Sequence, residues 1–298
     1  IKYLVENYNV ISFDTFIEGI KGEKNLPKNS VIITFDDGYK DNYLNAYPIL
    51  KKYNVPATIF LSTNHIDSSS PFWWDEVAYL IGKTRMRQLS LSRLGKFSLE
   101  NSAQKRRAIN AIAGKLKGLD EGQKRAAISE MAAQTEVSID EQAMKDAHLS
   151  WEEVREMSRG GISFGAHTVT HPILTKVSYE QARYEISESI SKIQKEIDQE
   201  VRFFAYPNGA IGDFNETTRN ILIENGIISA VTLVCGINDL SNGDLDLYAL
   251  RRILITSDDF PMFVVKMTGI LETPWAVVRR KPFIFLSTPG RLISGGAG

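Results

Sequence analysis

The sequence predicts an α/β fold of parallel βα units that carries a mainly helical insertion. Apolar, β-rich runs recur along the chain, and polar sequence of helical character follows each one, which is typical of parallel strands joined by helices. The runs are NVISF (9–13), VIITF (31–35), PATIFL (56–61), GISFGA (161–166), VRFFAY (201–206) and ISAVTL (228–233). Between residues 72 and 147 the pattern changes to an alanine-, lysine- and glutamate-rich stretch with helical spacing and no convincing strand.

The helix after the fourth run is the most clearly marked element. Ser178 and Gln181 have the spacing of a capping box at its start. Its apolar residues recur on one face, as expected of a helix that covers a sheet or barrel; they are Ala182, Ile186, Ile190, Ile193 and Ile197. We expect the barrel domain, with the insertion at 72–147, to span residues 1–273 and a C-terminal tail to span 274–298, with a frayed end in GRLISGGAG.

Composition excludes several classes of partner. With 298 residues, of which 43% are apolar, the chain can bury the core of one large barrel or of two ordinary domains. The 35 basic and 36 acidic residues nearly cancel, so nothing in the charge favours nucleic acid or an anionic membrane. The single cysteine excludes an internal disulfide, and no apolar run approaches the roughly 18 residues of a transmembrane segment.

The first residues lack the basic start and the apolar stretch that are typical of a signal peptide. The chain opens at Ile1 in what resembles the end of an amphipathic helix, so an upstream portion can be missing. We therefore expect a cell-envelope or secreted protein if an upstream signal was lost, and a cytoplasmic protein otherwise.

The strongest chemical signal is TFDDGYKDNY (34–43), where two adjacent acids end an apolar strand. Side chains of neighbouring strand residues point to opposite faces, but at the end of a strand both can turn toward one site. A structural alternative is that Asp-Gly forms a turn and that Asp37 or Asp41 caps the next helix.

A second motif, FGAHTVTHP (164–172), places two histidines four positions apart after another strand. If His167 to His171 formed one helical turn, the two imidazoles would face one metal ion, although Pro172 limits such a turn. A third motif, FFAYPNG (203–209), is a strand that ends in a proline-containing turn. All three motifs lie at carboxyl ends of predicted parallel strands, where α/β barrels build active sites.

One carboxylate and two histidines do not identify the reaction. Three protein ligands and an open position are typical of catalytic zinc, yet two histidines and a carboxylate also form the facial triad of non-haem Fe(II) oxygenases. The second acid of the pair favours hydrolysis, because a neighbouring Asp can accept a proton from water without occupying the metal.

Together the motifs resemble those of the polysaccharide deacetylases, the NodB-homology family of carbohydrate esterases (family 4). TFDDGY is similar to the first family motif, HTVTH to the second and FAYPNG to the third, in the family order, and the resemblance runs from about residue 9 to 270. It implies a distorted (β/α)7 barrel and a hydrolase that removes acetyl from an N-acetylated glycan. It also implies a divalent metal, with Zn²⁺ expected first and Co²⁺, Ni²⁺ or Fe²⁺ as alternatives.

The resemblance assigns roles by position. Asp36 would be the catalytic base, and Asp37, His167 and His171 would hold the metal. A backbone N–H in the turn from Tyr206 to Gly209, which includes Asn208, would stabilise the oxyanion.

Two positions depart from the family pattern. Ala205 stands where many members have an arginine that orients the catalytic acid, so Arg252 or its neighbour Arg251 is expected to approach from a later strand, unless it forms only a structural salt bridge. Many members also place a general-acid histidine late in the chain, whereas no histidine follows His171 here. His65 and His148 are the remaining candidates.

These departures leave a second hypothesis beside the deacetylase: a saccharide-binding homologue that lacks the general acid and has lost turnover. If the protein were instead an Fe(II) oxygenase, Asp36 would have no evident role in the reaction. Trp73 and Trp74 could stack on sugar rings or pack within the helical insertion.

Overall fold

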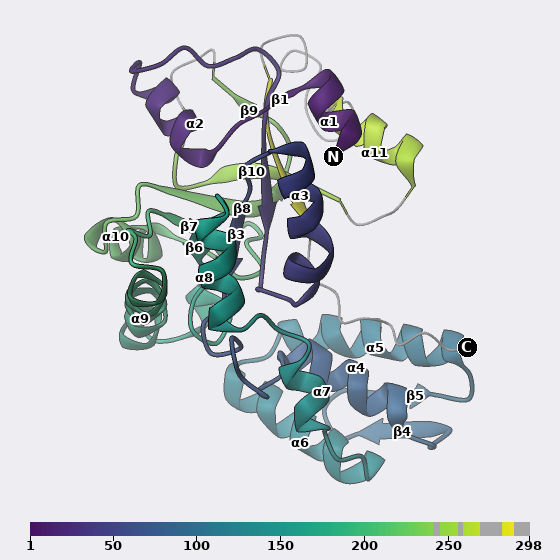
Figure 1. The fold of residues 1–298 in the computed structure, drawn as a ribbon. Helices are drawn as coiled ribbons and strands as arrows, with labels where there is room; N and C mark the ends of the chain where they lie inside the picture. Colours follow the sequence, from purple (N-terminus) through teal and green to yellow (C-terminus); the bar gives the residue numbers. More distant parts are fainter. Residues whose placement is uncertain (241–244, 256–258, 269–281, 289–298) are drawn as a thin grey trace. The chain divides into compact units, whose positions relative to one another are not determined.

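The computed structural model describes residues 1–240, 245–255, 259–268 and 282–288 (Figure 1). The chain divides into two compact units. The first unit combines Ile1–Asp67 with Ala147–Gly298, and the second is Ser68–Asp146. The second unit is therefore inserted into the first, with bounds close to those of the stretch in which the sequence pattern changes.

A ring of parallel strands forms the centre of the first unit. Seven strands pair in the order in which they occur along the chain, and the last of them also pairs with the first. These pairings join the two ends of the sheet, which confirms the expected distorted (β/α)7 barrel. The strands are β2 (Ser30–Phe35), β3 (Thr58–Leu61), β6 (Ser163–Ala166), β7 (Phe203–Ala205), β8 (Ser229–Cys235), β10 (Leu250–Leu254) and β11 (Pro282–Thr288). Two short strands extend the sheet, β1 (Asn9–Val10) beside β2 and β9 (Asn238–Asp239) antiparallel to β11.

Side chains alternate between the inside of the barrel and its helical cover, as strand geometry requires. One apolar cluster takes alternate strand residues from inside the barrel, and the ring of Phe13 stacks on that of Phe203 with centroids 4.5 Å apart. The strand residues of this inner cluster are Ile32, Phe60, Phe203, Ala205, Val231 and Leu250. Their sequence neighbours, such as Ile33 and Ile59, belong instead to the cluster shared with the surrounding helices.

Helices of the first unit follow the strands (Figure 1). Helix α9 begins where predicted, because the Ser178 side chain accepts a hydrogen bond from the Gln181 N–H. Among the described residues, no helix has the length and apolarity to cross a bilayer. The helices are α1 (Lys2–Asn7), α2 (Phe13–Ile20), a π-helical turn (Asn42–Ala46), α3 (Tyr47–Tyr53), α8 (Trp151–Arg159), a 3₁₀ turn (Leu174–Lys176), α9 (Tyr179–Ile197), α10 (Glu216–Glu224) and α11 (Phe260–Met267).

Two sequence predictions in the first unit were wrong. The run 9–13 is a strand only at Asn9–Val10, because Ser12 caps helix α2 by accepting a hydrogen bond from the Thr15 N–H. The predicted tail 274–298 contains strand β11, so the barrel domain does not end at residue 273. Ile284 of this strand is buried and pairs with Val31. The expected frayed end, 290–298, lies outside the described residues.

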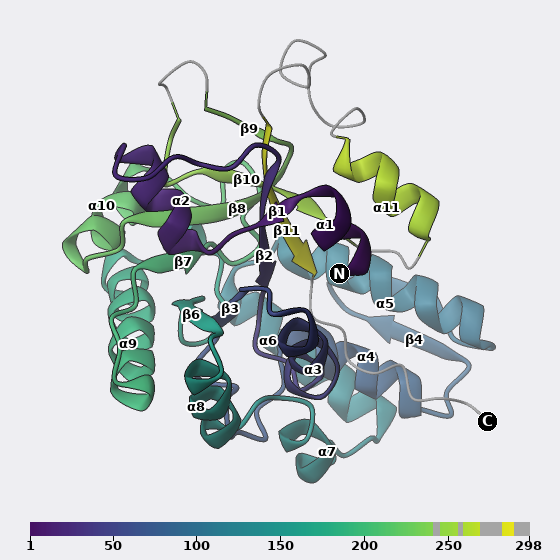
Figure 2. The same ribbon diagram turned by 45° about the horizontal axis from the view of Figure 1, so that its top comes forward.

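The second unit is mainly helical (Figure 2), and it also contains a hairpin, whose two strands are labelled in Figure 1. Strands β4 (Gln88–Leu91) and β5 (Gly95–Ser98) pair antiparallel, which corrects the expectation of no strand in this stretch. In β4 burial alternates, with Leu89 and Leu91 inward. A strand this short gives too weak a period-two signal to detect in sequence. The helices are α4 (Trp73–Lys83), α5 (Ser102–Lys117), α6 (Glu121–Thr135) and α7 (Glu141–Lys145).

Asp67 joins the two segments of the first unit at the point where the second unit is inserted. Its backbone N–H donates to the Leu149 carbonyl at 3.0 Å, and its side chain accepts from the Trp151 N–H at 2.8 Å. The chain therefore leaves and re-enters the barrel at one place, here called the closed neck, where Asp67 is hydrogen-bonded to Leu149 and Trp151.

We expect Ile284→Ala to lower the free energy of unfolding by about 2–5 kcal/mol, because it leaves a cavity between β11 and the helices. Urea unfolding followed by circular dichroism measures the change. The matched control is Ile223→Ala on α10, where the side chain is 48% exposed, and we expect a change within about 0.5 kcal/mol there. Equal effects of the two substitutions would show that β11 does not contribute to the core.

Candidate metal and active site

Three predicted metal ligands converge at the carboxyl ends of β2 and β6. The Oδ1 atom of Asp37 lies 3.5 Å from Nε2 of His167 and 3.6 Å from Nε2 of His171. All three residues are buried, and one ligand atom from each lies within 4.8 Å of the others. This spacing matches that of ligands around a single divalent ion.

The hydrogen bonds around these ligands also fit a cation. Nδ1 of His167 donates to the backbone carbonyl of Ala205 at 2.6 Å, which leaves the Nε2 lone pair directed toward Asp37. Oδ1 of Asp37 is buried and has no hydrogen-bond partner. A buried carboxylate oxygen without a partner costs free energy, and a bound cation would offset that cost.

The protonation of the ligands follows from their burial and mutual attraction. Burial raises the pKa of Asp37 above its usual value, although the neighbouring His167 opposes the rise. Burial alone would lower the pKa of His167, but its interaction with Asp37 and the charge of Asp36 outweigh the burial, so that this pKa is raised. A cation binds the deprotonated forms of both groups, so metal ions and protons would compete for this site.

The histidine motif reaches this geometry by a loop and not by the helical turn considered for it. Residues 167–171 contain no helix, and the rings of His167 and His171 lie 4.7 Å apart at 76°. Thr168 and His171 adopt left-handed backbone conformations, with φ of 67° and 61°. The loop turns sharply at these two positions, which brings His171 back toward His167.

The loop rests on a buried carboxylate that the sequence did not single out. Glu185, on α9, accepts hydrogen bonds from the backbone N–H groups of Val169 and Thr170, both at 2.8 Å. A glutamate on an amphipathic helix is normally assigned to the solvent side, so helical spacing alone could not find it. The sequence signal that could have found it is its position one turn from Gln181 and Ser189, on the face that includes Ala182 and Ile186.

Asp36 points into the barrel and forms a two-pronged ion pair with Arg252. The guanidinium donates to the two carboxylate oxygens at 2.8 and 2.7 Å, and the Arg252 side chain is 0% exposed. Arg252 also donates to the carbonyl of Thr232 and to the hydroxyls of Thr34 and Ser287. Of the two arginines considered from sequence, Arg252 is thus the one that contacts Asp36, while Arg251 is exposed.

The ion pair sets the charge of Asp36. Burial alone would raise the pKa of this carboxyl, but the charge of Arg252 and its hydrogen bonds outweigh the burial and hold the pKa below its usual range. Asp36 is therefore an anion fixed beside the three ligands, while Asp37 has its pKa shifted in the opposite direction.

The turn after β7 offers one backbone donor. The Tyr206 N–H donates to Val231 within the sheet, the Gly209 N–H to Pro207, and Pro207 itself has no N–H. Of the backbone N–H groups in the predicted turn, that of Asn208 is therefore the candidate oxyanion donor.

The turn itself requires an unusual backbone conformation. Asn208 and Gly209 are both left-handed, with φ of 57° and 58°, and a Cβ at Gly209 would lie 2.7 Å from the Leu233 nitrogen. Glycine alone fits that position.

The two general-acid candidates lie together. The rings of His65 and His148 are 5.6 Å apart, and that of His148 stacks on Tyr39 at 5.3 Å. Backbone bonds from Leu149 to Gly38 and from Asn64 to Val169 join these segments to the two motifs that supply the ligands. Both histidines are buried, and their role in proton transfer stays a prediction.

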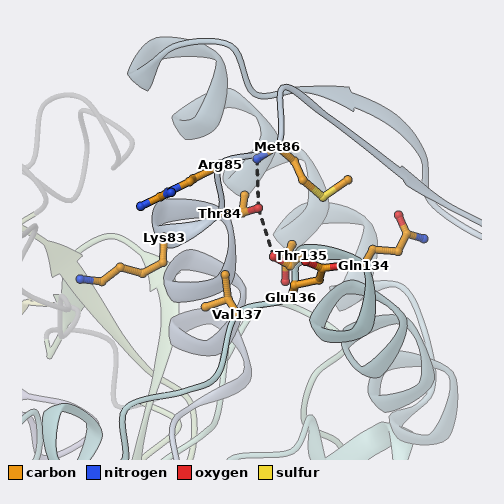
Figure 3. Close-up of a pocket in the computed structure, with 8 residues that line it drawn as sticks. All are labelled: Lys83, Thr84, Arg85, Met86, Gln134, Thr135, Glu136 and Val137. Atoms are coloured by element: carbon orange, nitrogen blue, oxygen red, sulfur yellow. Dashed lines mark hydrogen bonds between the residues drawn. The ribbon is translucent and has the colours of Figure 1, made fainter.

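Other candidate features do not belong to this site. A cavity of about 490 Å³ lies within the second unit, where helices α4 and α6 end (Figure 3), and its lining includes none of the predicted site residues. Trp73 is buried in the core of that unit, and Trp74 stacks on Phe72 with centroids 4.5 Å apart. Packing thus accounts for the position of Trp73 and for one face of Trp74.

Comparison with known proteins points to one family. The family model described as "Polysaccharide deacetylase" matches residues 23–92 and 100–229. These ranges include the three ligands, Asp36 and the turn after β7, and they exclude Arg252.

Individual relatives are more distant. The polysaccharide deacetylase homologue YxkH of Bacillus subtilis (strain 168) is 25% identical over 234 residues, which are 78% of this chain and 54% of that protein. A poly-beta-1,6-N-acetyl-D-glucosamine N-deacetylase of Staphylococcus epidermidis is 54% identical over 50 residues, or 17% of each chain. The chain thus spans about half the length of the first of these relatives.

A solved structure shares the fold. The Streptococcus pyogenes deacetylase PplD, determined in complex with acetate, superposes with a TM-score of 0.55 over 90% of this chain and 81% of its own, at 23% identity. At that identity the similarity establishes the fold alone.

We expect Arg252→Met to lower the free energy of unfolding by about 3–5 kcal/mol, because it leaves the Asp36 charge buried without its partner. Chemical denaturation at neutral pH measures this loss. The neighbouring Arg251→Met removes an exposed arginine and should change stability by no more than about 0.5 kcal/mol. A similar small loss for both arginines would contradict the importance of the buried ion pair.

Proposed function

The chain belongs to the polysaccharide deacetylase family, and from this premise we propose that it is a metal-dependent hydrolase that removes N-acetyl groups from an N-acetylated saccharide or polysaccharide. One observation carries the proposal. Three ligand atoms converge on one point, and beside them lies a carboxylate, Asp36, that an arginine holds as an anion.

The residues present fit a divalent cation, and we propose Zn²⁺, with Co²⁺, Ni²⁺ or Fe²⁺ as alternatives. Asp37, His167 and His171 would hold it and leave positions open for water and substrate. When bound, such an ion supplies a Lewis acid that polarises the acetyl carbonyl and makes water more acidic.

The chain's own groups then account for the proton and charge movements of amide hydrolysis. The Asp36 carboxylate accepts a proton from the water that attacks the acetyl carbon. The Asn208 N–H donates to the carbonyl oxygen as negative charge develops on it. Cleavage of the C–N bond releases acetate, and the leaving nitrogen takes up a proton to become an amine.

The donor of that last proton is a prediction carried by two residues. His65 and His148 form a buried pair beside the ligand loops. The sequence has four histidines, so His65 and His148 are its only imidazoles besides the two predicted ligands.

The substrate class comes from the relatives. The Staphylococcus epidermidis relative is named as an N-deacetylase of poly-beta-1,6-N-acetyl-D-glucosamine. We propose an N-acetylglucosamine-containing glycan for this chain, because the reaction requires an N-acetyl group and the formal net charge of -1 favours a neutral polymer.

Two other functions remain as outcomes of the tests. A saccharide-binding homologue would bind the glycan and the metal without releasing acetate. An Fe(II) oxygenase would need oxygen and a co-substrate, and it would leave Asp36 and its arginine without a task.

We expect Asp36→Asn to lower acetate release from N-acetylglucosamine oligomers by about 10²–10⁴-fold while metal content stays at the wild-type level, because the amide cannot accept the proton. His167→Ala should lose both acetate release and bound metal. Acetate is assayed enzymatically and metal by mass spectrometry on the same samples. Wild-type protein that holds metal and binds oligomers yet releases no acetate would favour the binding homologue.

Chelation should abolish acetate release, and addition of Zn²⁺ or Co²⁺ should restore it. A cation binds the deprotonated forms of its ligands, and the pKa values of Asp37 and His167 are raised. Reconstitution should therefore also release protons, which an indicator dye in weak buffer would detect. Turnover that persists after the metal has been removed to below a tenth of an equivalent would contradict a metal-dependent reaction.

A further inference from the structure

In the part of the chain that the structure describes, Glu185 is a buried carboxylate next to the ligand loop (167–171) that the proposed mechanism does not use. Its side chain is 0% exposed, on the face of α9 that packs against the barrel. Among the described residues, four donors reach it. Val169 N–H and Thr170 N–H bond to Oε2, both at 2.8 Å, and the Thr170 hydroxyl and the Gln181 amide bond to Oε1, at 2.6 and 2.9 Å.

The two backbone donors lie between the two strained residues of the loop. Thr168 and His171 have φ of 67° and 61°, conformations that cost about 1–3 kcal/mol for residues other than glycine. The His171 N–H bonds back to the Thr168 hydroxyl at 3.0 Å. Residues 169 and 170 are therefore a short bridge whose position decides where the His171 ring points.

We propose that Glu185 is a positioning residue for the metal centre: it holds the 168–171 loop in the strained conformation that brings His171 to the metal. This inference rests on the proposed function, because it assumes that His171 binds a metal ion. Glu185 touches neither His171 nor substrate in this role, so it acts only through the loop.

The chemistry of the four bonds predicts which substitutions are tolerated. A glutamine can turn its oxygen toward the two backbone donors, and its amide can then face a rotated Thr170 hydroxyl and a flipped Gln181 amide. An aspartate keeps the charge but is shorter by one methylene, so it cannot reach the loop from α9. Reach should therefore matter more than charge.

The test measures Co²⁺ affinity and the visible absorption of bound Co²⁺ for the full chain, so it needs no substrate. We expect Glu185→Asp to weaken Co²⁺ binding by about 10-fold or more and to change the absorption at saturation, because one imidazole ligand is displaced. Glu185→Gln should lose less affinity than Glu185→Asp. Glu188→Asp, an exposed position on the same helix, is the matched control and should behave as wild type.

A double-mutant cycle with His171→Ala separates positioning from general destabilisation. If Glu185 acts through His171, Glu185→Asp should weaken Co²⁺ binding no further once His171 is alanine. Additive losses, or single variants with wild-type affinity and spectrum, would overturn the inference and leave the metal centre intact. Wild-type protein that binds neither Co²⁺ nor Zn²⁺ would overturn the metal centre itself, and the inference with it.

Discussion

The ion pair between Arg252 and Asp36 is the interaction on which the rest of the site depends. A buried charge is tolerated only when its partner and hydrogen bonds are in place. Here the guanidinium comes from β10, its carboxylate follows β2, and its further acceptors belong to β2, β8 and β11. The pair joins β10 to the end of β2, and β11 lies between these two strands and supplies Ser287 to the same guanidinium. The ion pair and the closing strand thus hold the same part of the barrel together.

The ion pair also explains how two adjacent aspartates come to differ. Asp36 turns inward to the arginine and stays ionised, whereas Asp37 adopts a left-handed backbone, with φ of 74°, and faces two imidazoles. Two carboxyls with pKa values shifted in opposite directions can divide proton transfer and cation binding between them. The barrel therefore creates the difference by the direction in which each side chain leaves the end of β2.

Short sequence patterns were enough to predict the features that depend on neighbouring residues. The ligands and Asp36 lie in short motifs, and most strands show as apolar runs, so both were found from sequence. Strand β10 does not show as an apolar run because two arginines interrupt it, and only the expected approach of an arginine from a later strand indicated it. One of these two, Arg252, is the largest fully buried side chain among the described residues. Strand β11 was placed in a tail because its partner β2 lies some 250 residues earlier, and such pairing leaves no local trace. Glu185 was missed for another reason: a glutamate on an amphipathic helix is normally assigned to the solvent side, whereas this one accepts hydrogen bonds from a loop before the helix.

The closed neck at Asp67 bears on how such a protein can change over evolutionary time. The chain leaves the barrel after Asp67 and returns before Leu149, and backbone and side-chain hydrogen bonds join these two positions. In the connectivity of the barrel, the inserted unit therefore takes the place of a surface loop. A segment joined in this way can be lengthened, replaced or lost by recombination without rethreading a strand. The deacetylase-type barrel can therefore acquire or exchange an accessory module as a cassette, while the order of its strands and the chemistry at their ends are inherited unchanged.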